Sequence, residues 1–497
     1  MSEHTSQRVV VIGGGLAGIR AAIGLRDAGV EVTLVEARPR LGGAASSYAR
    51  GGMTIDNGQH VFLRCCASYQ ELLERLDATG LVSVQERFDV TVLSPRGTAR
   101  LRRTGLPGPL QFGKALAGYR LLSLTERIKI ARAALAMRFL DPADPALDRT
   151  RLGDWLAAKS QSESARRLMW DLFIVSALNI AGDDASLPLS ATVIKMALLG
   201  ERGAADIGIA SVPLGDVHGR AAADLLGRLG ARVMYGSRAA AIEPLASGGF
   251  RVRIESAAGG TRLADGNGSP TAAEVSELVA DGVVLAVPAS QARRLAGPAG
   301  ISAADRWDDL GSSPIVNIHV IYDRQITSLP FAAAVESPVQ WVFDKTRQAG
   351  LAAGQYLAVS LSAADSYVDV PAASLRDQFL PALEQLFPAA AGASVTDFFV
   401  TRERRATFRQ SPGTGALRPG TATSVPGLVL AGAWTDTGWP DTMEGAVRSG
   451  QHAAEKLISE LNELPRGATG GRPPGPTPVE AGVVSSATTP AETKAAS

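Results

Sequence analysis

The chain has 497 residues, of which 45% are hydrophobic and 20% are charged, and its formal net charge is +1. This balance is typical of a globular protein with a large buried core, and the length allows two or three domain-sized units. We expect no nucleic-acid partner, because proteins that bind nucleic acids usually show a basic excess.

Residues 8–36 predict a strand, a glycine turn, a helix and a second strand. The run 9–12 is apolar throughout, as expected of a strand that is buried on both faces. Apolar residues then recur at helical spacing, and Gly29 ends the predicted helix. The second strand ends at Glu36.

Within this unit, Gly13, Gly15 and Gly18 form the pattern G-x-G-x-x-G between strand and helix, with Glu36 further on. The first glycine permits a tight turn, the second lets a pyrophosphate approach the backbone, and the third lets helix and strand pack closely. The helix N-terminus offers N–H groups to phosphates, and Glu36 can accept hydrogen bonds from a ribose. The unit therefore predicts a dinucleotide-binding site.

A second glycine pair follows directly in the segment ARPRLGG, residues 37–43. Glu36, Arg40, Gly42 and Gly43 form the pattern E-x-x-x-R-x-G-G. The glycines would bring further backbone N–H groups, and the arginine a cation, to the same pyrophosphate. This addition is rare in nicotinamide enzymes.

The segment TIDNGQHVFLRCC, residues 54–66, places a dense group of polar residues just before an apolar run. The polar side chains are those of Asp56, Asn57, Gln59 and His60. Taken alone, the group is either a polar turn or a surface that faces a ligand. The adjacent Cys65 and Cys66 cannot form a disulfide framework or a spaced metal site, so we expect no metal and a reducing, cytoplasmic setting. We interpret them as small buried apolar groups.

The middle of the chain, residues 96–214, predicts mostly helices. The run 124–140 has apolar residues with arginine and lysine between them, typical of a helix packed on a core or of one that touches a membrane. The longest uncharged apolar stretch, residues 172–182, is shorter than the roughly 20 residues that span a bilayer, and the N-terminus lacks a signal-peptide core. We expect a cytoplasmic protein, not integral to a membrane, that could contact its inner face.

The rest of the chain predicts strands, one long helix and a tail. Residues 230–288 predict short strands, and residues 314–323 alternate as a half-exposed strand does. Residues 427–434, GLVLAGAW, predict a strand, followed by a loop and an amphipathic helix. Residues 464–497 are rich in proline, glycine, serine, threonine and alanine and lack aromatic residues, so we expect a disordered tail.

With its two glycine motifs, the chain resembles the superfamily of FAD-dependent amine oxidases and phytoene desaturases. The resemblance implies FAD as the cofactor and an α/β fold, in which a Rossmann-like FAD-binding domain carries an inserted α+β substrate domain. It also implies a strand at Ala239 beside the adenine, and a C-terminal strand through Gly432 that leads to a helix whose first N–H groups face the flavin. The predicted cofactor-binding residues are Gly13, Gly15, Leu16, Ala17, Gly18, Glu36, Ala37, Arg40, Gly42, Gly43, Asn57, Gly58, Gln59, His60, Ala239, Gly432, Met443 and Glu444.

Four segments narrow the resemblance to the hydroxysqualene dehydroxylase family, also described as squalene-associated FAD-dependent desaturases. They are RPRLGG (38–43), DNGQHVFLRCC (56–66), ALNIAGDDAS (177–186) and GWPDTMEGAVRSGQ (438–451). The sequence departs from the superfamily at Ala44, where an arginine often stands, and at Ala433, where an acid is common. Ser46, Asp436 or a backbone amide would have to supply those contacts.

The resemblance implies reductive loss of the hydroxyl group of hydroxysqualene, which gives squalene, the precursor of hopanoids. Protonation lets the allylic hydroxyl leave as water, and reduced FAD can deliver hydride to the delocalised cation. The candidate proton donors are His60, Asp56 and Asp441. Each also has a structural interpretation: His60 could order its turn or bind a phosphate, Asp56 would need a raised pKa, and Asp441 could cap the following helix. The other histidines carry no local pattern.

The predicted FAD-binding domain comprises residues 1–95, 215–300 and 405–463, and the predicted substrate domain comprises residues 96–214 and 301–404. Expected partners are the C30 isoprenoid hydroxysqualene, a membrane surface and neighbouring enzymes of squalene biosynthesis. Two alternatives stay open. One is a flavoenzyme that acts on another polyene, such as a carotenoid desaturase, or on an amine, and the other is a flavin-containing assembly partner without turnover.

Overall fold

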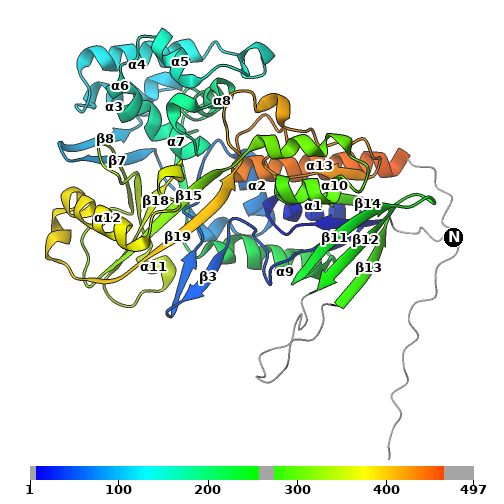
Figure 1. The fold of residues 1–497 in the computed structure, drawn as a ribbon. Helices are drawn as coiled ribbons and strands as arrows, with labels where there is room; N and C mark the ends of the chain where they lie inside the picture. Colours follow the sequence, from blue (N-terminus) through cyan, green and yellow to red (C-terminus); the bar gives the residue numbers. More distant parts are fainter. Residues whose placement is uncertain (1–6, 257–273, 464–497) are drawn as a thin grey trace, which may run out of the picture. The chain divides into compact units, whose positions relative to one another are not determined.

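The computed structural model describes residues 7–256 and 274–463 (Figure 1). A five-stranded parallel sheet is assembled from segments that lie far apart in the sequence. All neighbouring strands of the sheet are parallel, in the order β10-β2-β1-β14-β20. The strands are β1 (Arg8–Ile12), β2 (Glu31–Val35), β10 (Arg232–Met234), β14 (Gly282–Leu285) and β20 (Leu428–Leu430). The run 9–12 is buried as predicted, because β1 lies between β2 and β14.

The first and last helices of the described chain, α1 (Leu16–Asp27) and α13 (Met443–Glu463), pack directly against each other. A Cβ on Gly450 would lie 2.2 Å from the carbonyl oxygen of Ala17, and one on Gly24 would lie 2.9 Å from Cβ of Ala454. Small residues at these positions therefore let the two helix backbones come into contact. Helix α2 (Ala67–Arg75) contacts α13 and α9 (Ala221–Arg228) contacts α1, whereas α10 (Ala289–Ala296) packs in a different hydrophobic cluster.

An antiparallel sheet of three strands continues from the parallel one. Its strands are β11 (Ser237–Pro244), β12 (Phe250–Ser256) and β13 (Glu274–Ala280). The register of β11 against β12 shifts between Ala239 and Ala241, so β11 bends there. The predicted short strands are confirmed for residues 230–256 and 274–288, while residues 257–273 lie outside the described residues.

The second large sheet has seven strands in the order β19-β15-β18-β17-β16-β7-β8, antiparallel except for the pair β16 and β7. The strands are β7 (Asp89–Ser94), β8 (Gly97–Arg102), β15 (Ser313–Tyr322), β16 (Phe331–Ala334), β17 (Trp341–Asp344), β18 (Gln355–Leu361) and β19 (Val395–Thr407). Helix α12 (Ala372–Leu386) packs against it.

The prediction of a half-exposed strand at residues 314–323 is wrong. Nine of the ten residues of β15 are buried. Ile318 packs in a cluster with Phe379 of α12, while Ile321 packs in a different cluster with Ile55. Both faces of β15 are therefore covered, and the alternating polar residues are buried as well.

The predicted helical region, residues 96–214, does contain most of the shorter helices, but it also holds two strands, β8 and β9 (Ile207–Ala210). The helices are α3 (Gly113–Gly118), α4 (Leu124–Met137), α5 (Leu152–Ala158), α6 (Glu163–Ala165), α7 (Asp171–Leu178) and α8 (Leu187–Ala197). Asn179 ends α7 with φ of 52° and joins the helices to the seven-stranded sheet. Its amide donates to the carbonyl of Ser313 and to Thr407 Oγ1, both at 3.1 Å.

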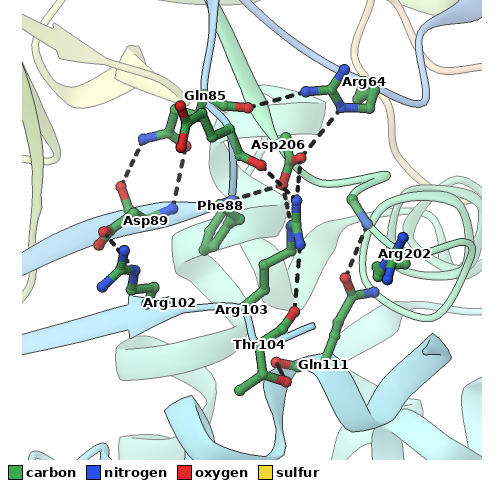
Figure 2. Close-up of polar contacts among 12 residues, drawn as sticks. Arg64, Gln85, Phe88, Asp89, Arg102, Arg103, Thr104, Gln111, Arg202 and Asp206 are labelled. Atoms are coloured by element: carbon green, nitrogen blue, oxygen red, sulfur yellow. Dashed lines mark hydrogen bonds and ion pairs between the residues drawn. The ribbon is translucent and has the colours of Figure 1, made fainter. Parts of the chain in front are cut away.

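Residues 56–60, which we call the polar loop, lie between two small sheets. The hairpin of β3 (Ser47–Arg50) and β4 (Met53–Asp56) precedes the loop, and β5 (Val61–Leu63) follows it and pairs with β9, which also pairs with β6 (Val82–Val84). Asp206 lies just before β9 and is 1% exposed. Its carboxylate accepts hydrogen bonds from Phe88 N and Arg103 Nη2, both at 2.7 Å, and forms an ion pair with Arg64 at 3.3 Å (Figure 2). This carboxylate links the small sheet to the seven-stranded one.

Across residues 7–256 and 274–463, no helix is long and apolar enough to cross a membrane. The predicted tail, residues 464–497, lies outside the described residues.

Candidate functional site

The first glycine loop, between β1 and α1, leaves no room for a side chain at Gly13 or Gly18. Gly13 has φ of +108°, and a Cβ on it would lie 2.3 Å from the carbonyl oxygen of Ala286. A Cβ on Gly18 would lie 1.8 Å from the carbonyl oxygen of Gly13. Among the described residues no side chain caps α1 at Gly15, so the N–H groups that follow, including those of Leu16 and Ala17, can bind an anion.

The second glycine pair lies directly against this loop. Gly42 N donates to the carbonyl of Gly14 at 2.9 Å, and a Cβ on Gly43 would lie 2.8 Å from Cα of Gly15. The two motifs therefore form one continuous backbone surface. Ala37 and Arg40 are exposed in the connecting loop, which leaves the arginine side chain free to turn toward a bound anion.

Glu36 is buried at the end of β2, next to both motifs. Its Oε2 accepts from Gly14 N at 2.6 Å and its Oε1 from Arg38 N at 2.8 Å. Each oxygen keeps a further lone pair for a ribose hydroxyl. Ser237 N, two residues before Ala239, donates to the carbonyl of Glu36 at 2.9 Å, so the start of β11 lies beside this carboxylate.

The C-terminal part of the predicted site follows β20. Gly432 has φ of +139°, and its N–H donates to Ser449 Oγ of α13 at 2.8 Å. Helix α13 begins at Met443, as predicted. The Glu444 side chain is 1% exposed and turns to α2, where its carboxylate accepts from Ser68 N and Tyr69 N. Glu444 can therefore offer its backbone N–H to a cofactor, but not its carboxylate.

The polar loop is built around Asp56, which is 3% exposed. Its Oδ1 accepts from Ser47 Oγ at 2.7 Å and from Leu214 N at 2.9 Å, and its Oδ2 pairs with Lys345 Nζ at 2.8 Å. Three donors thus surround the carboxylate. Both carboxylate oxygens are therefore engaged, which differs from the arrangement that a proton donor needs.

The residues next to Asp56 hold the polar loop beside the backbone surface that the two glycine motifs form, which we call the glycine surface. Asn57 Oδ1 accepts from Ser46 N at 3.1 Å, and Asn57 N donates to the carbonyl of Ser46. A Cβ on Gly58 would lie 3.3 Å from His60 Nε2. The loop from the second glycine pair and the polar loop are therefore held side by side.

His60 is half-buried and lines a small cavity together with Gln59, Phe343 and Lys345. Burial lowers the pKa of His60 from its ordinary value, and Lys345 lowers it further, while Asp56 and a backbone hydrogen bond at Ala44 oppose the shift. The imidazole is therefore neutral at pH 7.

Sequence reasoning missed Lys345, His218 and His319. His218 Nε2 lies 2.7 Å from Tyr69 Oη, and burial lowers its pKa to about 4. His319 lies 2.7 Å from Tyr356 Oη, and burial lowers its pKa to about 3. No local pattern marks these residues, because their partners come from distant segments.

Asp441 belongs to a different cluster, in the loop before α13. Its Oδ2 accepts from Phe408 N at 2.9 Å, and its backbone N–H donates to Gln410 Oε1 at 3.0 Å. Burial raises the pKa of Asp441 to about 6, against the lowering effects of the Phe408 N–H and Arg418. Within the described chain no hydrogen bond or ion pair joins Asp441 to Asp56 or His60.

Three features of the site fit the binding of a dinucleotide. The two glycine motifs leave a surface without side chains, the start of α1 is uncapped by side chains, and Glu36 stands at the end of β2. In addition, Ser46 Oγ and Gln59 Nε2 are buried without a hydrogen-bond partner among the described atoms, as expected of groups that contact a bound molecule.

Two relatives match over nearly their whole length. The chain is 30% identical to hydroxysqualene dehydroxylase of Rhodopseudomonas palustris over 458 residues, covering 91% of this chain and 99% of the relative. It is 24% identical to zeta-carotene desaturase of a Synechocystis species over 499 residues, covering 92% of this chain and 98% of the relative.

Among solved structures, putrescine oxidase bound to putrescine superposes with a TM-score of 0.65 and 19% identity, covering 91% of this chain and 99% of that one. This likeness shows the fold, and it confirms the predicted α/β architecture.

The model of the family described as flavin containing amine oxidoreductase matches residues 16–458. That match begins inside the first glycine motif, after Gly15, and spans the second glycine pair, the polar loop and the start of α13. The protein is an FAD-dependent oxidoreductase, as predicted. The chain belongs to the flavin-containing amine oxidoreductase family.

Proposed function

We propose that this protein converts hydroxysqualene to squalene by reductive dehydroxylation. The observation that carries the proposal is the 30% identity to a hydroxysqualene dehydroxylase over 99% of that enzyme's length. Among the segments that carry the resemblance to that family, DNGQH forms the loop around Asp56, and ALNIAGDDAS forms the junction at Asn179. Both are therefore at the site or at the contact between the helices and the seven-stranded sheet.

We propose that the two glycine motifs and the start of α1 hold the pyrophosphate of FAD, with Glu36 on the ribose and Ala239 beside the adenine. The N–H groups of Met443 and Glu444 would then face the flavin. When bound and reduced, FAD supplies the hydride. The chain itself has to orient the substrate, exclude water and protonate the leaving hydroxyl.

We assign the proton to Asp441. The Asp56 carboxylate is surrounded by three donor groups, and burial lowers the pKa of His60. Asp441 has a pKa raised to about 6, so a fraction of it carries a proton near neutral pH. Its Oδ1 has no hydrogen-bond partner among the residues that the structure describes, which leaves this oxygen for the proton. His60 then orders the loop beside Lys345.

We place the substrate in the region of residues 96–214 and 301–404, which holds most of the seven-stranded sheet and the helices α3 to α8. The core there is rich in large apolar side chains, such as those of Trp170, Phe331 and Phe343. An apolar interior of this kind is the surrounding that a C30 hydrocarbon chain would need. Association with neighbouring enzymes of squalene biosynthesis stays a prediction.

The test is an anaerobic single turnover. The purified protein with bound FAD is photoreduced and mixed with hydroxysqualene, the flavin absorbance is followed, and the product is analysed by mass spectrometry. We expect reoxidation of the flavin without oxygen and one squalene per flavin. If only oxygen reoxidises the flavin and no squalene forms, the proposal fails.

A second candidate, desaturation of a polyene, is favoured by the 24% identity to a zeta-carotene desaturase. It predicts the opposite electron flow. Oxidised protein mixed anaerobically with phytoene or zeta-carotene would bleach its flavin and lengthen the conjugated system of the polyene, and hydroxysqualene would leave reduced protein unchanged.

A further inference from the structure

Six of the ten large apolar side chains that are exposed among the described residues fall between positions 106 and 139. They are Leu106, Leu110, Leu124, Ile128, Leu135 and Phe139, and their exposed fractions run from 50% to 81%. We call these six residues the apolar surface. Single exposed apolar residues are ordinary, but six of them within one segment make this part of the chain a candidate contact surface.

Helix α4 has two apolar faces. At 3.6 residues per turn, the side chains of Leu124, Ile128 and Leu135 lie within an arc of about 40°. Its buried residues, Ile130, Ala133 and Met137, lie on the opposite side and pack on the core. A helix that only covers a core needs one apolar face, the buried one.

Basic residues flank the exposed face of α4. On the same helical projection Arg132 lies to one side of the apolar row and Arg138 to the other. Both are exposed, and neither guanidinium pairs with a carboxylate within the described ranges. Residues 106–139 contain six basic residues and one acid, Glu126, in a chain whose net charge is +1. Glu126 is engaged by Ser123 and Ser162, where it caps α4.

The loop that carries Leu106 and Leu110 is held in place. Gln111 is fully buried, its backbone carbonyl accepts from Thr104 N at 2.7 Å, and its Oε1 accepts from Gly203 N at 3.1 Å (Figure 2). The same close-up shows Arg103, just before this loop, bound to the buried Asp206. The two leucines are therefore presented to solvent from an anchored loop, and α3 connects this loop to α4.

We propose that the apolar surface docks on an anionic lipid bilayer, with α4 lying in the plane of the interface. A row of separate apolar side chains between unpaired arginines is the pattern of an interfacial helix, whose cations meet lipid phosphates while its apolar side chains enter the acyl boundary. A second copy of the same surface fits less well, because the arginines would face each other. The proposal goes beyond the proposed function and is measured without any substrate.

The test uses the full chain with bound FAD and vesicles of phosphatidylcholine with or without 30% phosphatidylglycerol, followed by flotation. We expect wild type to float with the anionic vesicles and to be released by high salt. Phe139→Glu and Ile128→Glu should bind about tenfold more weakly or worse, because a charge replaces a side chain that enters the bilayer. Arg132→Gln with Arg138→Gln should lose about fivefold in affinity per arginine.

Matched controls are Val275→Glu, on β13 and 60% exposed, and Arg306→Gln, also exposed, and both should float like wild type. Phe139→Trp should bind as well as wild type, since an aromatic side chain is kept. The flavin absorbance and circular dichroism of each variant report folding. The proposal is overturned if wild type does not float, if Phe139→Glu floats equally well, or if sedimentation shows that these variants instead dissociate a dimer.

Discussion

Lys345 Nζ lies 2.8 Å from Asp56 Oδ2, and the two side chains are only 11% and 2% exposed. Asp56 ends β4 and Lys345 follows β17, so this ion pair joins the polar loop to the seven-stranded sheet. Because the other carboxylate oxygen is bound by Ser47 and Leu214, the whole arrangement is centred on one buried negative charge. Such a charge is costly without its partner.

Removing the cation should therefore destabilise the protein strongly. Lys345→Met leaves the Asp56 carboxylate buried and unpaired, and we expect the free energy of unfolding to fall by about 3–5 kcal/mol in a urea titration. The surface pair of Arg167 and Glu163, whose side chains are 72% and 67% exposed, is the control. Arg167→Met should cost less than about 1 kcal/mol. Equal losses in the two variants would contradict a central role for the buried pair.

The parts of the structure that could be predicted are those fixed by short spacings. Gly13, Gly18 and Glu36 predicted the strand, turn and helix because each acts on neighbours within one supersecondary unit, and the C-terminal helix at Met443 followed from its periodicity. Lys345 and His218 could not be found, because each meets its partner only through the tertiary fold. The error at β15 has the same origin, since alternating polarity cannot reveal that a second layer covers the polar face.

The glycine surface predicts which substitutions remove the cofactor. A methyl group at Gly18 would lie 1.8 Å from the carbonyl oxygen of Gly13, and one at Gly43 would lie 2.8 Å from Cα of Gly15 while φ is +56°. We expect Gly18→Ala to be purified without FAD and Gly43→Ala to bind FAD at least about tenfold more weakly. The measurement is the ratio of flavin to protein absorbance and a titration of the apoprotein.

The control for this pair is Gly227→Ala, in the helix α9, where an added Cβ meets nothing within 4 Å. It should keep its FAD and gain up to about 1 kcal/mol in stability, because alanine favours the helix. Full FAD content in Gly18→Ala would show that the loop does not hold the cofactor.

Acid should destabilise the protein through His218. Burial lowers its pKa from 6.5 to about 4, so between these pH values the unfolded chain binds more protons than the folded one. The free energy of unfolding therefore falls as the pH drops through this window, by up to about 3 kcal/mol. His218→Gln keeps a polar side chain next to Tyr69 but cannot titrate, so its stability should depend less on pH between 4 and 7. His452→Gln, exposed on α13, should titrate like wild type.

Asp441 should act in the opposite direction. Burial raises its pKa from 3.8 to about 6, so between these values the folded state binds more protons than the unfolded chain. Its contribution to stability is therefore present at low pH and is lost as the pH rises through about 6, by up to about 3 kcal/mol. Asp441→Asn can still accept from Phe408 N and has no charge to bury, so relative to wild type it should gain stability between pH 4 and pH 7 in urea titrations.

The same residue gives a separate prediction for turnover, because a proton donor has to be protonated when the substrate binds. If Asp441 protonates the leaving hydroxyl, kcat/KM for hydroxysqualene should fall tenfold per pH unit above about pH 6 in wild type. In Asp441→Asn it should be lower by roughly 100-fold or more and flat with pH, while FAD stays bound. Asp377→Asn, exposed on α12, is the matched control and should follow the wild-type profile. A wild-type profile in Asp441→Asn would show that Asp441 has only a structural role in the loop before α13. His60→Gln would then be the next variant to measure.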